Sequence, residues 1–397
     1  MRITQGTGQT QFLTAINALD EAINQTQGQI SSNKAFTTAS QDPIAAGEVN
    51  SYNQTLAQSQ QFSTNANGVK GNLNTEDSAL SQVQNLMNSL RSLVLEANSG
   101  TLTASNRQAI ASQAKQIQNG LLTLANTQNG NGEYIFGGFA VQSQPFTLTA
   151  TGATYNGDSG VRQVEIAAGQ TVANGDTGDT VFNQIKTGNG TFTVTANQAN
   201  TGSGLIGASS VTNPSLYNGG TYTINFTAAN AYQVLDSSNN VVSSGSYQDG
   251  TTIAFNGLQV DLSGTPATGD SFTVAAATNQ SLFATVQNIV STLTNPPTSA
   301  SSTALNNTFA GALNNIDQAL NQFSNVRASV GGRLNAITAQ QSVATTQQTQ
   351  LQTSISNLQG LNYAQAITQL DQENTTLQAA LQAYTLTQGL SLFKYIQ

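Results

Sequence analysis

The spacing of apolar residues changes twice along this 397-residue chain, and that change constrains its fold more than any other feature. Near both ends, apolar side chains recur at steps of three, four and seven residues, the spacing of one face of a helix. At the start they are Phe12, Ile16, Leu19, Ile23 and Ile30. At the end they are Ile367, Leu370, Leu377, Leu381 and Tyr384. Both ends are therefore predicted to form heptad helices.

Further helices are predicted inside these ends. Asp42-Pro43 has the form of an N-cap followed by proline in the first turn, so a helix restarts there. Helical spacing then marks separate helices over 80–97 and 110–124, and another over 309–337.

Between about residues 133 and 280 the apolar period falls to two, as in a half-buried strand. Runs such as "GTFTVTA", "GTYTINFT" and "TIAFNGLQVDL" are rich in β-branched and aromatic residues. The dipeptides Asn156-Gly157, Asn218-Gly219, Asp249-Gly250 and Asn256-Gly257 are typical of turns and hairpins.

The order of helices, strands and helices predicts an α+β fold. We expect a discontinuous helical-bundle or coiled-coil rod built from both chain ends, with an inserted antiparallel β domain. Two separate helical domains fit the order nearly as well. The expected boundaries are 1–40 with 363–397 for a terminal coiled-coil domain, 41–144 with 281–362 for a helical rod domain, and 145–280 for an outer β domain, either whole or divided into 145–187 and 188–280.

Composition argues against several functions. Charged residues make up 8% of the chain, the net charge is −8, and the 11 basic residues are scattered singly, so we expect no nucleic-acid partner. The chain has no Cys and no His, which removes thiolate chemistry and the commonest general base. No apolar run approaches the length of a membrane span, and the start lacks the pattern of a cleaved signal peptide.

Three motifs suggest chemistry, and each is better explained by structure. "NGDSG" (156–160) resembles a serine-nucleophile loop, but Ser159 would need a base and the chain has no His. Asp176 and Asp179 could supply oxygens to calcium, although an exposed turn is favoured. The spacing of Glu133 and Glu165 gives no support for an acid–base pair. We predict no catalytic residue, no metal and no cofactor.

Two other groups are assigned structural roles. The residues Tyr134, Phe136, Gly137 and Gly138 combine alternating aromatics with a flexible pair, which predicts packing at a domain junction. Arg327 and Arg333 lie near an apolar seam, and each could pair with a carboxylate of a neighbouring helix or of a neighbouring subunit.

The terminal apolar faces are the candidate assembly interface. No charged residue lies between Leu334 and Leu370, so another helix can approach there without burying a charge. Ordering each end costs about 1–2 kcal/mol per residue in backbone entropy, whereas each buried apolar side chain returns about 1.5–3 kcal/mol. Two helices alone are therefore marginal, and further chains are expected to cover them. The predicted interface residues are Phe12, Ile16, Leu19, Ile23, Ile30, Ile367, Leu370, Leu377, Leu381, Tyr384, Leu390, Leu392 and Phe393.

Several stretches, together roughly half the chain, resemble the flagellin family of the bacterial flagellum, and within it the hook–filament junction proteins. They are "MRIT" with its heptad helix, "SSNKAFTTASQDPIAA", "NGEYIFGGFAVQSQPF" with the following "YNGDSGVRQVEIAAGQTVANGDTGDTVF", and "LQAALQAYTLTQGLSLFKYI". Asn33 stands where the family usually has Gly, and Gln41 where it has Asp.

The resemblance implies a rod-like subunit in a ring of identical copies that joins hook to filament, between hook-associated protein 1 and flagellin. It also implies an extracellular place in the flagellum, export without a cleaved signal, terminal segments that are disordered before assembly, and an export chaperone on the C-terminal helix. A flagellin-like filament subunit is the alternative within the same class. The β insert could instead be an adhesin or glycan-binding module, although the absence of Trp gives this little support.

Overall fold

The structure is a computed structural model that describes residues 2–99, 103–296 and 302–389. Residues up to Thr64, together with those from Gln340 onward, form one compact unit, which we call the terminal-helix unit. Asn65–Ala339 form a second, which we call the core unit. The helices are α1 (Arg2–Ser32), α2 (Pro43–Ala97), α3 (Ala104–Ala125), the π-helix η1 (Asp179–Asn183), α4 (Leu282–Thr294), α5 (Ser302–Gln359) and α6 (Tyr363–Gly389). The strands are β1 (Phe146–Thr149), β2 (Gly152–Tyr155), β3 (Gln163–Ala167), β4 (Gln170–Ala173), β5 (Ile185–Lys186), β6 (Phe192–Ala196), β7 (Leu205–Val211), β8 (Tyr222–Ala228), β9 (Ala231–Asp236), β10 (Val241–Ser246), β11 (Thr252–Phe255), β12 (Leu258–Ser263), β13 (Ser271–Ala276) and β14 (Asn279–Gln280).

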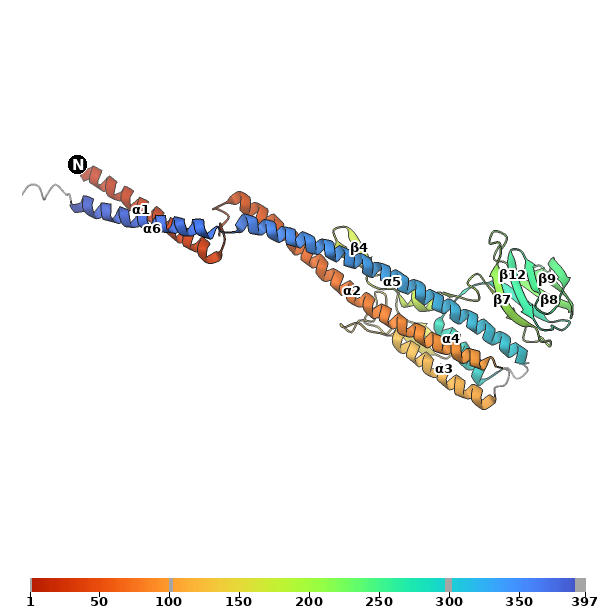
Figure 1. Cartoon of the computed structure of the whole chain (residues 1–397). Helices are drawn as coiled ribbons and strands as arrows, with labels where there is room; N and C mark the ends of the chain where they lie inside the picture. The colour runs from red at the N-terminus through yellow and green to blue at the C-terminus, as the bar shows by residue number, and fades with distance from the viewer. Residues whose placement is uncertain (1, 100–102, 297–301, 390–397) are drawn as a thin grey trace, which may run out of the picture. The chain divides into compact units, whose positions relative to one another are not determined.

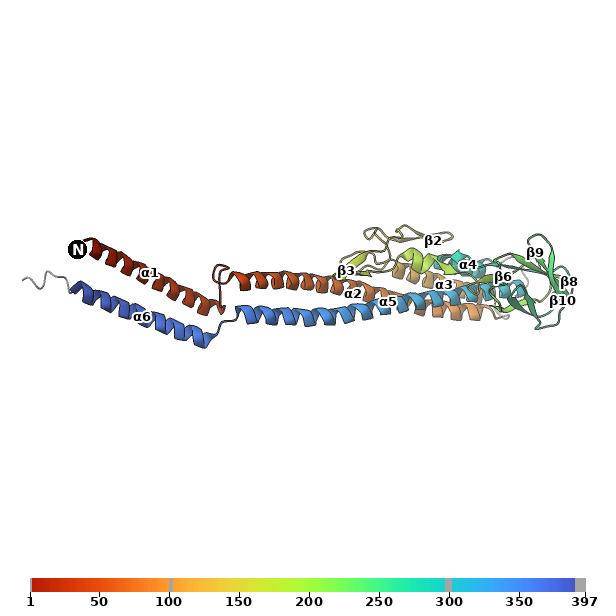
Figure 2. The ribbon, with the colours of Figure 1, turned by 90° about the horizontal axis from the view of Figure 1, so that it is seen from above.

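In the terminal-helix unit, α1 and α6 lie side by side and antiparallel (Figure 1, Figure 2). Phe12 stacks on Tyr384 with ring centroids 4.2 Å apart. Farther along the pair, the Tyr363 hydroxyl donates to the Ile30 carbonyl at 3.2 Å. The predicted helices at both ends are confirmed.

The turn between α1 and α2 follows the local sequence. Asn33 has φ 55°, a left-handed conformation that Asn adopts more readily than most residues, so it can replace the Gly usual there. The Asp42 carboxylate accepts a hydrogen bond from the Ala45 backbone N–H at 3.0 Å. Asp42 therefore caps α2 and Pro43 is the first helical residue, as predicted.

The prediction of separate helices after Pro43 and over 80–97 was wrong, because α2 is one helix of 55 residues. Gly68 and Gly71 lower the helix propensity of this part of α2. Ala66, Val69 and Leu73 are nevertheless fully buried there, and tertiary packing of this kind outweighs local propensity.

The core unit contains a helical core and a β-sandwich. In the helical core, α2, α3, α4 and α5 pack with the hairpins β1–β2 and β3–β4 around a continuous apolar cluster. An aromatic group lies within it, formed by Phe136, Phe146, Phe182, Phe283 and Phe323.

The β-sandwich has its own apolar core. One sheet has the strand order β10-β9-β8-β13-β6 and the other β11-β12-β7, with antiparallel pairing throughout. Asn256 and Gly257 both have positive φ and join β11 to β12 as the predicted hairpin. The predicted α+β fold, in which helices from both chain ends flank an antiparallel β insert in the sequence, is confirmed (Figure 1).

Two asparagines of α5 attach the sandwich to the helices. The buried Asn307 side chain accepts from the Ile206 N–H at 2.8 Å and donates to the Gly204 carbonyl at 2.9 Å. Asn315 accepts from the Gly188 N–H at 2.9 Å. Each bond joins a side chain to a backbone group, so it positions the backbone of the insert on α5.

Candidate functional site

The predicted interface residues that the structure describes lie on α1 and α6, and most of them are at least partly buried. Ile23 is buried, and Ile367 and Leu381 are exposed. The partly buried members are Phe12, Ile16, Leu19, Ile30, Leu370, Leu377 and Tyr384. Leu390, Leu392 and Phe393 lie outside the described residues.

Large apolar side chains remain uncovered on the terminal-helix unit. The exposed fraction is 71% for Leu386, 49% for Ile367 and 46% for Leu381 on α6, and Ile44 and Val343 are more than half exposed. Monomeric proteins expose single apolar side chains routinely, but a series along one element marks an interaction surface. This surface is therefore the candidate functional site.

The four predicted junction residues lie at the entry to the β1–β2 hairpin in the core unit. Phe136 is fully buried and makes an edge contact with Phe182 at a centroid distance of 5.1 Å. The Tyr134 N–H donates to the Val141 carbonyl at 2.9 Å. Gly138 has φ +70°, and a Cβ there would stand 2.3 Å from the Asp158 carbonyl oxygen. Glycine is therefore required at this position for both conformation and space.

Asp158, which sequence analysis missed, holds this loop closed. Its carboxylate accepts from the Phe139 N–H at 3.0 Å and from the Gly160 N–H at 2.7 Å. These two backbone donors hold the pKa of Asp158 below its ordinary value. The Tyr155 hydroxyl donates to the Phe136 and Asp158 carbonyls, and burial raises the pKa of Tyr155 to about 12. The phenol therefore stays protonated, as these bonds need.

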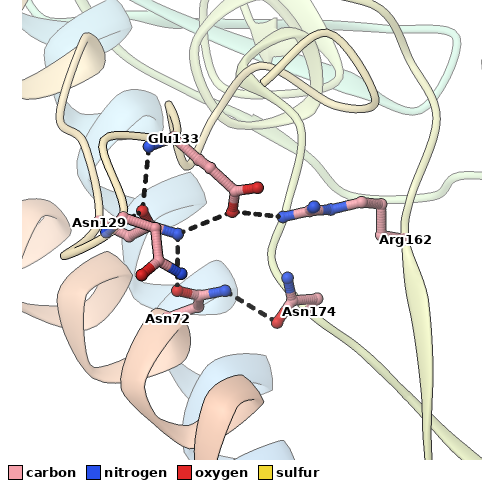
Figure 3. A network of polar contacts seen from close by, with 6 residues as sticks. Asn72, Asn129, Glu133, Arg162 and Asn174 are labelled. Atoms are coloured by element: carbon pink, nitrogen blue, oxygen red, sulfur yellow. Dashed lines mark hydrogen bonds and ion pairs between the residues drawn. The ribbon is translucent and has the colours of Figure 1, made fainter. Parts of the chain in front are cut away.

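Beside this loop, a polar network joins α2 to the segments around it (Figure 3). The Asn129 amide donates to Asn72 at 3.1 Å and to Glu133 at 3.0 Å. Asn72 in turn donates to Asn174 at 3.0 Å, and Arg162 reaches Glu133 at 3.4 Å. The hydrogen bond from Asn129, and then that from Arg162, hold the pKa of Glu133 below its ordinary value.

Both arginines that the sequence left undecided pair with carboxylates of the same chain. Arg327 of α5 meets Asp77 of α2 at 2.8 Å. Arg333, also of α5, pairs with Asp176 in the segment after β4. Asp176 also donates its backbone N–H to the buried Glu76 carboxylate at 3.3 Å. These contacts join α2, α5 and the segment after β4 within the core unit.

The other motifs occupy structural positions. Ser159 is exposed in a bend, as the turn interpretation predicts. The Asp179 side chain accepts from Asn183 and Gln184 at the ends of η1. Glu165 accepts from the Gly169 N–H within its own hairpin, whereas Glu133 belongs to the network of Figure 3. Within residues 2–99, 103–296 and 302–389, no three His, Cys, Asp or Glu side chains form a metal-binding group. No helix in that part of the chain is long and apolar enough to cross a membrane.

Comparison with known families matches both ends and the insert. Residues 4–140 match the N-terminal helical region of bacterial flagellin, and residues 313–396 match its C-terminal helical region. Residues 195–276 match the D2-like domain of flagellar hook-associated protein 1. The helices at both chain ends match these flagellin regions, and they flank a β insert in the sequence. This combination defines a flagellin-type structural subunit.

Solved structures identify the family within this class. FlgL from Xanthomonas campestris is 34% identical, with 77% of this chain and 99% of that chain covered and a TM-score of 0.71. Hook-associated protein 3 from Legionella pneumophila is 30% identical, with 78% and 98% covered and a TM-score of 0.74. The chain belongs to the family of flagellar hook-associated protein 3, and the resemblance stated from the sequence is confirmed.

Curated relatives agree with this assignment over a shorter stretch. Flagellar hook-associated protein 3 of Salmonella typhimurium is 34% identical over 157 residues, and that of Escherichia coli is 32% identical over 157 residues. In both cases the matched stretch is 40% of this chain and 49% of the relative, so the chain matches about half the length of these curated relatives.

Proposed function

We propose that this chain is a structural adaptor that joins the flagellar hook to the flagellin filament. Its mechanism is coupled folding and assembly, in which α1 and α6 complete their apolar contacts only against neighbouring subunits. The observation that carries the proposal is the series of exposed apolar side chains on α6, namely Ile367, Leu381 and Leu386. A structure of a family relative from Legionella pneumophila is described as that of a flagellar junction protein, which supports the same role here.

The stabilisation from covering these side chains can be compared with the cost of association. Fully burying a Leu or Ile side chain stabilises by about 1.5–3 kcal/mol. Covering the half-exposed Ile367 and Leu381 and the more exposed Leu386 would therefore stabilise each neighbour contact by several kcal/mol, on the order of 3–5. Association costs about 4–15 kcal/mol in lost translational and rotational freedom, so one such contact does not suffice and the proposal needs several contacts for each subunit, as in a closed ring.

The partners follow from this role. In the proposal, identical copies form a ring, hook-associated protein 1 lies on the hook side and flagellin on the filament side. The chain acts outside the cell in the flagellum after export without a cleaved signal, and an export chaperone covers its C-terminal helix until assembly. The flagellin-type helical regions at both ends support contact with partners that carry the same regions.

A charge on the exposed face of α6 tests the proposal. We expect Ile367→Asp and Leu381→Asp to abolish swimming and filament retention while the secreted chain keeps its helix content. Leu216→Asp is the matched control, because Leu216 is 60% exposed in the core unit and should tolerate the change. Deletion of residues 368–397 should give the same loss with a folded core unit. Normal filament growth in the α6 variants or in the truncated chain would contradict the proposal.

A second candidate is a flagellin-like filament subunit, which the two flagellin helical matches favour. The two roles differ in copy number, since a junction ring needs few subunits and a filament needs thousands. Electron microscopy of the purified chain after seeding distinguishes them. Long filaments of this chain alone would favour the filament role, and short rings or caps the junction role.

A further inference from the structure

Glu76 is a buried carboxylate that the proposed function does not use. It lies on α2 in the core unit, and only 1% of it is exposed. Its Oε1 accepts from the Asp176 backbone N–H at 3.3 Å. Its Oε2 is buried and has no hydrogen-bond partner among the described residues. An ionised carboxylate in this position would have a hydrogen bond at only one of its two oxygens among the described residues.

The charges around Glu76 do not balance it. Asp176 approaches it from the segment after β4, and Arg333 approaches from α5. Arg333 donates Nη2 to the Asp176 carboxylate, while its Nε and Nη1 atoms have no partner in the described part of the chain. The guanidinium of Arg333 is thus bonded to the partly buried Asp176 carboxylate, whereas the buried Glu76 carboxylate has no ion pair with it among the described residues. An unpaired charge in such a site strongly destabilises the folded state.

The remaining nearby charges are already paired. On α2, the adjacent Asp77 pairs with Arg327 of α5 at 2.8 Å. On the other side of Asp176, Arg162 pairs with Glu133. Burial, and then the negative charge of Asp176, raise the pKa of Glu76 well above its ordinary value, and the positive charge of Arg333 opposes this only in part.

We propose that Glu76 keeps its proton in the folded chain at neutral pH and donates it in a hydrogen bond to the Asp176 carboxylate. The hydrogen-bonded series Glu76–Asp176–Arg333 then joins α2, the segment after β4, and α5. Loss of that proton to solvent base leaves two carboxylates facing each other, and the segment separates from α2. The device is thus a proton-dependent latch inside the core unit. In this proposal an acid and a carboxylate are paired through one shared proton, which would occupy the Glu76 Oε2 atom that otherwise has no partner in the described part of the chain.

The latch would control the aromatic packing of the core unit. Two residues after Asp176, the Gly178 N–H donates to the Phe136 carbonyl at 2.9 Å, and η1 then places Phe182 in the core. Separation of Asp176 from Glu76 removes one of the two side-chain contacts between this segment and α2 described above, the other being the bond from Asn72 to Asn174. The amides of Asp176, Gly178 and Val181 therefore report whether the latch is open.

The sign of the pH dependence follows from the raised pKa. Below the ordinary glutamate pKa, Glu76 is protonated in both the closed and the open state, and the latch has its full stability. Between that value and the folded-state pKa, only the closed state holds the proton. The opening constant should therefore rise with pH by about tenfold per pH unit and then level off above the folded-state pKa.

Hydrogen exchange of these three amides in the full chain, corrected for intrinsic rates, tests the proposal from pH 5 upward. We expect the tenfold rise in the wild type. Glu76→Gln should remove the pH dependence yet match wild-type protection at pH 5, because its amide can donate to Asp176 as the acid does. Glu133→Gln is the matched control, since it removes a neighbouring carboxylate and should keep the rise.

The proposal would be overturned by an absence of pH dependence in the wild type, by loss of the rise in Glu133→Gln, or by opening that is at least about tenfold greater in Glu76→Gln at pH 5. The last result would mean that an ionised Glu76 is needed for folding. Failure of Glu76→Gln to fold would mean the same. The carboxyl ¹³C shift of Glu76 in the wild type needs no variant, and it should be that of a neutral acid at pH 7. An ionised shift there would also overturn the proposal.

Discussion

At the scale of single residues, asparagine takes structural roles that many proteins give to charged residues. Asn126 at the end of α3 donates to the Phe146 carbonyl at 2.9 Å and accepts from the Phe146 N–H at 2.9 Å. One amide side chain thus satisfies both backbone groups of a fully buried residue, as a neighbouring strand would. Asn129 and Asn307 also bond to backbone groups, since Asn129 accepts from the Glu133 N–H and Asn307 from the Ile206 N–H. With 8% charged residues, the chain depends on such amides for its buried polar contacts.

We expect Asn126→Ala to destabilise the core unit by about 1–3 kcal/mol, because it leaves the buried Phe146 N–H without a partner, while the Phe146 carbonyl keeps its bond from Gln144. Asn119→Ala on the same helix is the control. Asn119 is exposed, so its replacement should change stability by less than about 0.5 kcal/mol. Denaturant unfolding followed by circular dichroism measures both. Equal effects of the two variants would show that the paired bonds to Phe146 contribute little.

At the scale of elements, the short π-helix η1 organises the aromatic core. Phe182 lies 5.1 Å from Phe136, 5.4 Å from Phe146 and 5.9 Å from Phe323 between ring centroids. Phe136 lies in the loop before β1, Phe146 in β1 and Phe323 in α5. The Phe182 side chain therefore connects three parts of the fold. The preceding residue, Val181, is buried as well. A turn of η1 therefore buries two adjacent side chains.

Phe182→Ala should destabilise the core unit by about 3–5 kcal/mol, since it removes a large side chain from a site with no solvent access. Phe139→Ala gives the comparison, because Phe139 is 61% exposed and its loss should cost much less. Thermal unfolding of both variants provides the measurement. A change below about 1 kcal/mol in Phe182→Ala would mean that the core closes around the gap.

Elements with strong periodicity could be predicted from the sequence, and others could not. The seam from Phe12 to Ile30 and the dipeptide Asn256-Gly257 each carry a local signal, and both led to the observed structure. Strands β7 and β10 were missed, because "LIGASSV" and "VVSSGS" replace apolar residues with Gly, Ala and Ser and so lack alternation. The continuity of α2 across its glycines was missed because burial, which is a tertiary effect, decides it.

The polar network of Figure 3 and the contact of Glu76 with Asp176 could not be predicted, because the partners are far apart in the sequence. Asn72 and Asn174 are 102 residues apart, and Glu76 and Asp176 are 100 residues apart. No periodicity relates such pairs, and sequence analysis singled out Asp176 only as a candidate calcium ligand or turn residue. Arg333 was recognised as an ion-pair candidate, but whether its partner belonged to the same chain required the structure.

At the scale of the whole molecule, the two units differ in how completely they bury their apolar residues. Leu80, Phe146 and Phe272 of the core unit are fully buried, whereas Ile367 and Leu381 of the terminal-helix unit are about half exposed. Local stability depends on such burial, so the two units should differ in it. Under the proposed function, the less stable unit is the one that neighbours complete.

Amide exchange on the free full-length chain should therefore divide by unit. We expect amides of α1 and α6 to exchange about a hundredfold faster or more than those of α2 around Leu80, since local opening energies range from about 0 to the global value. Mass spectrometry of peptides from the full chain gives the measurement. Equal protection of α1, α6 and the core unit in dilute solution would contradict coupled folding and assembly.

The long uncharged stretch around the exposed Val343, Tyr363 and Ile367 determines how contacts made through it respond to the salt content of the surrounding water. Dissolved ions screen the attraction between exposed charges that lie more than about 10 Å apart at 0.1 M salt, but these side chains carry no charge to screen. Contacts made through this face should keep their strength from a freshwater pond to a brackish estuary. Cooling should loosen them instead, since the hydrophobic attraction weakens in the cold.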